Sequence, residues 1–113
     1  MAAFENVRSV DNLIIVSGQL PIDEQGKTDK AGSYHNQALE SLREIEKVAL
    51  KEGLNKNNIV KTTLFLTDIN KLSEVNDAYN EFFDERKPAR SALQVVALAQ
   101  GVSVEIDAIL KKD

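Results

Sequence analysis

The sequence contains no cysteine and only one histidine among its 113 residues. The absence of cysteine excludes disulfide frameworks, thiolate nucleophiles and zinc or iron–sulfur sites built on cysteine. With His35 as the single imidazole, a metal site would have to rely on carboxylates alone, so we predict that the chain holds no metal ion. His35 falls in the first turn of a predicted helix, where we expect it to lie at the surface.

Long hydrophobic runs are also missing. The longest uninterrupted apolar stretch, Leu13 to Val16, is far shorter than the roughly 20 residues that a membrane helix needs. The first residues, MAAFENVRSVD, include two acidic side chains and no apolar run of signal-peptide length. We therefore expect a cytoplasmic protein without a membrane partner.

Positive charge and aromatic residues are scarce as well. The formal net charge is −4, the isoelectric point is about 5.0, and aromatic residues make up 5% of the chain. A nucleic-acid-binding protein normally carries a basic patch that neutralises phosphates, and single-strand binders add aromatic platforms for stacking. Acidic residues accompany most of the lysines here, so we predict no nucleic-acid partner.

The hydrophobic pattern predicts one α+β domain over residues 1–113, with five strands and two helices. The strands are predicted at 4–10, 13–19, 59–67, 91–97 and 102–110. The first helix begins after Ser33 as N-cap and ends before Gly53, which takes the left-handed C′ position. The second helix carries an apolar stripe that ends at Phe82. A short segment with Gly101 joins the last two strands, so we predict a hairpin there.

The resulting order is β-β-α-β-α-β-β. Each helix has a single apolar stripe, so the two helices can cover only one face of a mixed sheet. Several strands are nevertheless apolar on both faces, as Leu13 and Ile15 alternate with Ile14 and Val16. An apolar second face needs a cover, and we predict that other copies of the chain supply it.

Two charged residues stand out as candidates for chemistry. Arg90 follows Pro88-Ala89 at the start of a strand, where its guanidinium could grip a carboxylate with two parallel hydrogen bonds or join an ion pair at the rim. Glu105 lies within the apolar strand VSVEIDAI, where burial would raise its pKa and suit it to proton transfer, unless it faces an edge or an ion-pair partner.

The predicted hairpin also constrains how these two residues act. It places Glu105 opposite Val95, so Arg90 lies about five residues along the strand, roughly 16 Å away at about 3.3 Å per residue. Within one subunit the two side chains could not readily share a ligand. If both act on one molecule, they must come from neighbouring subunits.

At this point the sequence resembles the Rid (YjgF) family of enamine/imine deaminases over nearly its whole length. The matching segments are 15–21 (IVSGQLP), 37–42 (QALESL), 59–66 (IVKTTLFL), 75–83 (VNDAYNEFF), 88–91 (PARS) and 104–109 (VEIDAI). The ordered set is specific, whereas any single segment would not be.

The resemblance implies a chorismate-mutase-like fold, a homotrimer, and ligand clefts between subunits. It also implies hydrolysis of reactive 2-imino or 2-enamino acids, such as 2-iminobutanoate and 2-iminopropanoate released by pyridoxal-phosphate enzymes, to 2-keto acids and ammonia without a cofactor. By the same resemblance, Arg90 binds the substrate carboxylate and Glu105 positions or activates the water. Ser17, Gly18 and Asn76 match positions that line the cleft.

The sequence departs from the family pattern at several positions. Ala92 stands where many members have cysteine, Phe4 where active members commonly have tyrosine, and Ala99 where a proline is usual. These departures leave a second function open, in which the same clefts bind a small 2-keto acid without turnover. RNA cleavage is a third function associated with the family, and the acidic charge argues against it.

Overall fold

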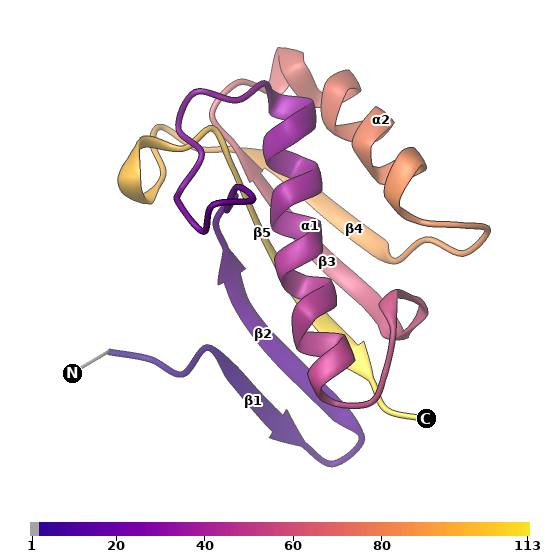
Figure 1. The fold of residues 1–113 in the computed structure, drawn as a ribbon. Helices are drawn as coiled ribbons and strands as arrows, with labels where there is room; N and C mark the ends of the chain where they lie inside the picture. The colour runs from indigo at the N-terminus through magenta and orange to yellow at the C-terminus, as the bar shows by residue number, and fades with distance from the viewer. Residues whose placement is uncertain (1–2) are drawn as a thin grey trace.

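The structure is a computed structural model that describes residues 3–113, and it contains a five-stranded mixed sheet and two helices (Figure 1). The strands are β1 (Val7–Val10), β2 (Leu13–Gln19), β3 (Ile59–Leu66), β4 (Ala89–Gln94) and β5 (Val104–Lys111), in the spatial order β1-β2-β5-β3-β4. Only β3 and β4 run parallel, and the other neighbours are antiparallel. The predicted α+β class and element order are confirmed.

The two helices begin and end close to the predicted residues. Helix α1 spans Tyr34–Lys51, and its N-cap Ser33 accepts a hydrogen bond from the backbone N–H of Asn36 at 3.1 Å. Gly53 follows this helix with a φ of +74°, a conformation that costs a residue with a Cβ more than it costs glycine. Helix α2 spans Leu72–Phe82.

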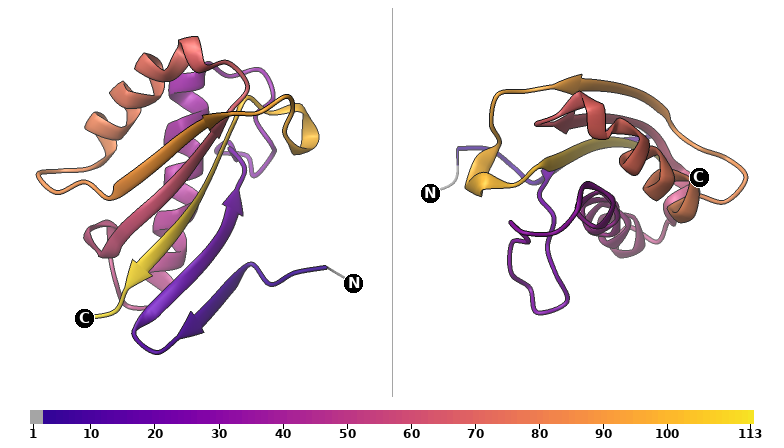
Figure 2. Two further views of the ribbon diagram at one scale, coloured as in Figure 1. Left: turned by 180° about the vertical axis from the view of Figure 1, so that it is seen from behind. Right: turned by 90° about the horizontal axis from the view of Figure 1, so that it is seen from above.

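Both helices pack on one face of the sheet, as predicted, and the views in Figure 2 show the other face without a helix. The core lies between the two layers, where the apolar stripes of the helices meet the inward side chains of the strands. Its largest fully buried apolar side chains are Ile14, Val16, Leu42, Ile45, Leu64, Leu66, Val75, Val104, Ile106 and Leu110. No helix within residues 3–113 combines the length and the apolar character that crossing a bilayer requires.

The predicted hairpin between the last two strands is wrong. Helix α2 returns the chain to the end of the sheet at which β3 begins. Strand β4 therefore runs parallel to β3, and it is the outermost strand on that side of the sheet. The segment 95–103 then carries the chain past β3, through Gln100 and Gly101 with φ values of +58° and +74°. Strand β5 enters between β2 and β3, where its apolar side chains are buried beneath the helices.

The helix-free face of the sheet, which we call the open face, is rich in apolar side chains. Val10, Ile15 and Leu93 expose 48%, 45% and 41% of their surface, and Phe65 and Ile109 are half-buried beside them. Lys61, Asp107 and Glu105 share this face, and the apolar side chains lie around them. Exposed apolar side chains gathered on one face often mark a site of protein–protein contact. This face therefore has the character of an interaction surface.

Candidate active site

Arg90 is held over an aromatic ring on the helix-covered face of the sheet. It is the second residue of β4 and pairs with Thr62 of β3. Its guanidinium carbon lies 4.8 Å from the ring centroid of Tyr79 on α2, a cation–π geometry. The Tyr79 hydroxyl is 2.8 Å from that of Thr62, and burial raises the pKa of Tyr79 to about 12. The Tyr79 hydroxyl is therefore neutral at physiological pH, and the side chain is held by Thr62 at its hydroxyl and by Arg90 at its ring.

The Arg90 cavity, as we name the hollow of about 390 Å³ in front of this guanidinium, contains no acidic residue in its lining. It is lined by Asn76, Tyr79, Asn80, Lys87, Pro88 and Arg90. Within residues 3–113, no carboxylate oxygen lies within 4.0 Å of a guanidinium nitrogen of Arg90, so the alternative of a rim ion pair is not found. The structure thus brings two predicted residues, Arg90 and Asn76, together around a cavity suited to an anion.

Glu105 lies on the open face, against a glycine of the neighbouring strand. It pairs with Phe65 of β3 in the centre of the sheet. A Cβ atom placed on Gly18 of β2 would lie only 2.0 Å from Glu105 Oε2. Burial, together with the negative charge of Asp107, raises the pKa of Glu105, as predicted from its place in an apolar strand. Glu105 forms no ion pair with any residue of the described range 3–113.

Ser17, which precedes Gly18, forms hydrogen bonds with the segment before β1. Its hydroxyl donates a hydrogen bond to the backbone carbonyl of Glu5 at 2.7 Å, and its N–H donates to the carbonyl of Asn6 at 2.9 Å. Both bonds tie the segment before β1 to the end of β2. In the isolated chain, Ser17 therefore holds the backbone beside Gly18 in place and has no free hydroxyl proton to offer.

The two halves of the predicted site do not meet within one chain. Arg90 and Glu105 pair with Thr62 and Phe65 on the two sides of β3. These β3 residues are three apart, about 10 Å along the strand, and β4 and β5 are separated by about another 10 Å across it. An odd separation also puts the side chains on opposite faces of the sheet. The predicted pairing of Glu105 with Val95 was thus wrong. The prediction that Arg90 and Glu105 lie far apart within one chain is nevertheless met.

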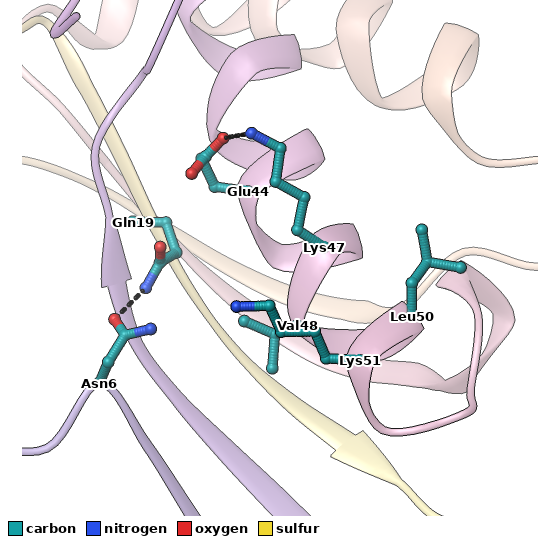
Figure 3. A pocket seen from close by; sticks show the side chains of 7 residues that line it. All are labelled: Asn6, Gln19, Glu44, Lys47, Val48, Leu50 and Lys51. Atoms are coloured by element: carbon teal, nitrogen blue, oxygen red, sulfur yellow. Dashed lines mark hydrogen bonds and ion pairs between the residues drawn. The ribbon is translucent and has the colours of Figure 1, made fainter. Parts of the chain in front are cut away.

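A second hollow, of about 380 Å³, lies between the N-terminal strands and the C-terminal half of α1 (Figure 3). Its polar groups are largely paired with one another, since Lys47 binds Glu44 at 2.6 Å and Gln19 donates to Asn6 at 2.9 Å. It contains none of the predicted site residues. We assign no function to it.

No group of three histidine, cysteine, aspartate or glutamate side chains within residues 3–113 is arranged to hold a metal ion. His35 instead pairs with Glu81 on α2, with 2.7 Å between Nε2 and Oε2. The Arg90 cavity therefore offers a guanidinium, two amides and a lysine, and the open face separately offers the Glu105 carboxyl group with its raised pKa.

The comparisons with known proteins agree with this architecture. The model of the family described as Endoribonuclease L-PSP matches residues 1–111. The chain therefore belongs to the Rid (YjgF) family.

Individual relatives carry several names. A 2-iminobutanoate/2-iminopropanoate deaminase from Bos taurus is 41% identical over 100 residues, which cover 88% of this chain and 73% of that protein. Protein HMF1 from Saccharomyces cerevisiae is 36% identical over 108 residues, covering 96% of this chain and 83% of that one. In the solved structure of the YjgF gene product from E. coli the fold is closely similar, with a TM-score of 0.90 at 33% identity, covering 100% of this chain and 91% of that one.

Proposed function

We propose that this protein is an enamine/imine deaminase that hydrolyses 2-imino acids of the 2-iminobutanoate and 2-iminopropanoate type to 2-keto acids and ammonia. The observation that carries the proposal is the guanidinium of Arg90, which has no ion-pair partner within residues 3–113 and lies over Tyr79 in a cavity with no acidic residue in its lining. The deaminase name of the bovine relative, at 41% identity, supports the same reaction.

Arg90 binds the substrate carboxylate in this proposal. A planar guanidinium with no protein carboxylate beside it can donate two parallel hydrogen bonds to a ligand carboxylate. The guanidinium carbon lies 4.8 Å from the Tyr79 ring centroid, and no carboxylate oxygen within residues 3–113 lies within 4.0 Å of the guanidinium, so its N–H groups are available for this purpose. The amide of Asn76, in the same cavity lining, supplies a further hydrogen-bonding group.

Glu105 transfers the protons. Water adds to the carbon of the protonated C=N bond, an iminium, and loses a proton to the Glu105 carboxylate, which gives a neutral carbinolamine. The protonated carboxyl then donates to the nitrogen, and the C–N bond breaks. As the C=O bond forms, the carbinolamine hydroxyl returns its proton to the Glu105 carboxylate, which passes it to the departing ammonia, so the products are the 2-keto acid and ammonium. A raised pKa suits Glu105 to both steps, because an acid–base catalyst works best with a pKa near the working pH. An imine is already electrophilic, so the scheme needs no cofactor.

The complete cleft is assembled from two subunits in our proposal. Arg90 and Glu105 lie on opposite faces of one sheet, so a single ligand can contact both only if they come from different chains. The apolar open face, with Ile15 and Leu93 near half exposure, gives the copies a surface on which to associate. We propose a homotrimer with one cleft at each subunit boundary, working in the cytoplasm.

The test is keto-acid and ammonia release from 2-aminoacrylate generated in place by a serine dehydratase, with wild type, Arg90→Ala and Glu105→Gln. We expect wild type to accelerate release and each variant to lose at least about tenfold in kcat/KM, since an anchoring ion pair or a proton-transfer group is removed. Lys30→Gln, at an exposed position outside the cavity lining, serves as the control for loss of one positive charge.

The second candidate function is binding of a small 2-keto acid without turnover. It is favoured by Phe4, which is 70% exposed and lacks a hydroxyl, and by Ala92, which offers no thiol two residues after Arg90. This function predicts that a 2-keto acid raises the melting temperature of wild type while release from 2-aminoacrylate stays at the background rate. That result would replace the deaminase proposal.

A further inference from the structure

The Arg90 cavity contains a second positive charge that the proposed reaction does not use. Lys87 and Arg90 both line it. Within residues 3–113, neither side chain has a carboxylate oxygen within 4.0 Å. Two free cations around one hollow repel each other, and an anionic ligand relieves that repulsion.

Three acidic residues lie within six positions before Lys87 along the chain, and two of them are engaged with other partners. Glu81 pairs with His35 at 2.7 Å, and Asp84 lies 3.8 Å from Lys56 Nζ. Lys56 also donates to the backbone carbonyl of Phe82 at 2.7 Å, which fixes its ammonium group at the end of α2. The third, Glu85, forms no ion pair within residues 3–113. No carboxylate of this range pairs with Lys87, so its charge is available to a ligand.

The backbone between the two cations is rigid. Pro88 lies between them and fixes its own φ near −65°, and Arg90 is locked in the β4 ladder opposite Thr62. Residues three apart in an extended chain are separated by about 10 Å between their Cα atoms. The two charges therefore approach the cavity from separate positions, and the amides of Asn76 and Asn80 complete its polar lining.

We propose that the Arg90 cavity selects substrates with two carboxylates, that is, four- or five-carbon 2-imino diacids in preference to 2-imino monoacids. Arg90 grips the carboxylate next to the imine carbon, and Lys87 binds the distal carboxylate. This inference rests on the proposed function for the reaction, and its recognition step is tested separately from turnover.

The first experiment measures binding of stable 2-keto acids by titration calorimetry at low ionic strength. The matched ligands are 2-oxoglutarate and 2-oxopentanoate, which share a five-carbon chain and differ in one distal carboxylate. We expect wild type to bind 2-oxoglutarate about threefold to fivefold more tightly, the upper range for a solvent-exposed ion pair. The preference is expected to shrink as salt is added, because exposed charges are screened.

The variant Lys87→Gln keeps the length and polarity of the side chain and removes its charge. We expect it to lose the preference for 2-oxoglutarate while its affinity for 2-oxopentanoate stays the same. Lys30→Gln, which removes an exposed charge outside the cavity lining, is expected to retain the preference. Equal binding of the two ligands by wild type, or a preference that survives in Lys87→Gln, would overturn the inference. Inorganic sulfate that binds as tightly as 2-oxoglutarate would do the same by revealing a general anion site.

The second experiment compares turnover of 2-iminosuccinate and 2-iminopropanoate, produced in place by amino-acid oxidases from aspartate and alanine. We expect a higher kcat/KM for 2-iminosuccinate, through a lower KM, and loss of this advantage in Lys87→Gln. If neither imine is hydrolysed but the 2-oxoglutarate preference depends on Lys87, the deaminase proposal fails and the diacid site stands. If both imines are hydrolysed with equal kcat/KM, the reaction stands and the diacid selectivity fails.

Discussion

Gly18 shows how one missing side chain positions a functional group. Its backbone lies so close to Glu105 that a Cβ atom would come within 2.0 Å of Oε2 and 2.8 Å of the carboxyl carbon. The φ of Gly18 is not in the left-handed region, so glycine is required here for space and not for backbone freedom. The atoms that would be displaced form the end of a flexible side chain, which can move without disturbing the sheet.

Gly18→Ala is therefore expected to separate activity from stability. The displaced carboxylate should lower deaminase kcat/KM by about tenfold or more, because a misplaced proton-transfer group loses its alignment. The melting temperature should stay within a few degrees of wild type. Thermal denaturation and imine hydrolysis measured on the same sample check both expectations.

Gly26→Ala is the matched control with the opposite pattern. Gly26 has a φ of +80° and open space around it, so a Cβ there strains the backbone by about 1 kcal/mol and touches nothing. It should lower the melting temperature and leave kcat/KM unchanged. If Gly18→Ala retains full activity, the close contact with Glu105 has no part in catalysis.

The sequence identified the charged residues of the candidate site but not their surroundings. Arg90 was predicted from its place after Pro88-Ala89, and Glu105 from a charge in an apolar strand. Tyr79 was predicted only as part of the apolar stripe of α2, because its contact with Arg90 exists only once β4 lies beside β3. Lys87 was missed for the same reason, since no local pattern shows that it lines a cavity with Asn76.

Secondary-structure elements were predictable because their signals are local. Each signal depends on residues that are close together in the sequence. Examples are the apolar stripes of α1 and α2, the Ser33 cap, and the alternation of buried and partly exposed residues along β5. Strand pairing is decided by interactions between distant segments. The last two strands looked like a hairpin, but β5 gains more burial in the centre of the sheet than at its edge.

Two neighbouring carboxyl groups, Asp29 and Glu40, lie where the long connection between β2 and α1 meets the helix. Burial raises the pKa of Glu40 on α1 to about 7, aided by a hydrogen bond with Asp29 and by the negative charges of Asp29 and Asp23. Asp29 also accepts backbone N–H groups from Gly32 at 2.7 Å and Ala31 at 3.2 Å. The hydrogen bond with Glu40, followed by these N–H groups, lowers the pKa of Asp29. Of the two carboxyl groups, Glu40 therefore keeps its proton to the higher pH.

This pair predicts a pH-dependent stability. Because the pKa of Glu40 is raised in the folded state, its contribution is complete below its ordinary value of 4.5 and is lost as pH rises through about 7. Allowing for partial solvent screening, we expect a loss of roughly 1 kcal/mol between pH 5 and pH 8. Glu40→Gln, which cannot ionise, should match wild type at pH 5 and exceed its stability at pH 8, as measured by chemical denaturation. Identical pH profiles for the two proteins would contradict the raised pKa of Glu40.

On the scale of the whole molecule, the two faces of the sheet have different tasks. The helix-covered face contains the core and places Arg90 over Tyr79, whereas the open face presents Glu105 among apolar side chains. A cleft that combines the two must bridge separate chains. Mixing subunits tests this directly.

Arg90→Ala and Glu105→Gln, each strongly impaired alone, should regain activity when refolded together. If each cleft takes Arg90 from one subunit and Glu105 from the next, a random 1:1 mixture should regain about a quarter of wild-type activity. The measurement is imine hydrolysis by the mixture, with sedimentation analysis and two different affinity tags to verify mixed assemblies. No recovery in verified mixed assemblies would show that the residues do not act in a shared cleft.

The central place of β5 also affects how the protein is made. Of the five strands, the one that joins the two halves of the sheet is synthesised last, since β5 pairs with both β2 and β3. Until β5 leaves the ribosome, the β1–β2 hairpin and the β3–α2–β4 unit have no shared sheet, and their apolar faces lie open to other chains. A nascent chain stalled before residue 104 would therefore be a substrate for chaperones, whereas a chain in which β5 has emerged can close the sheet.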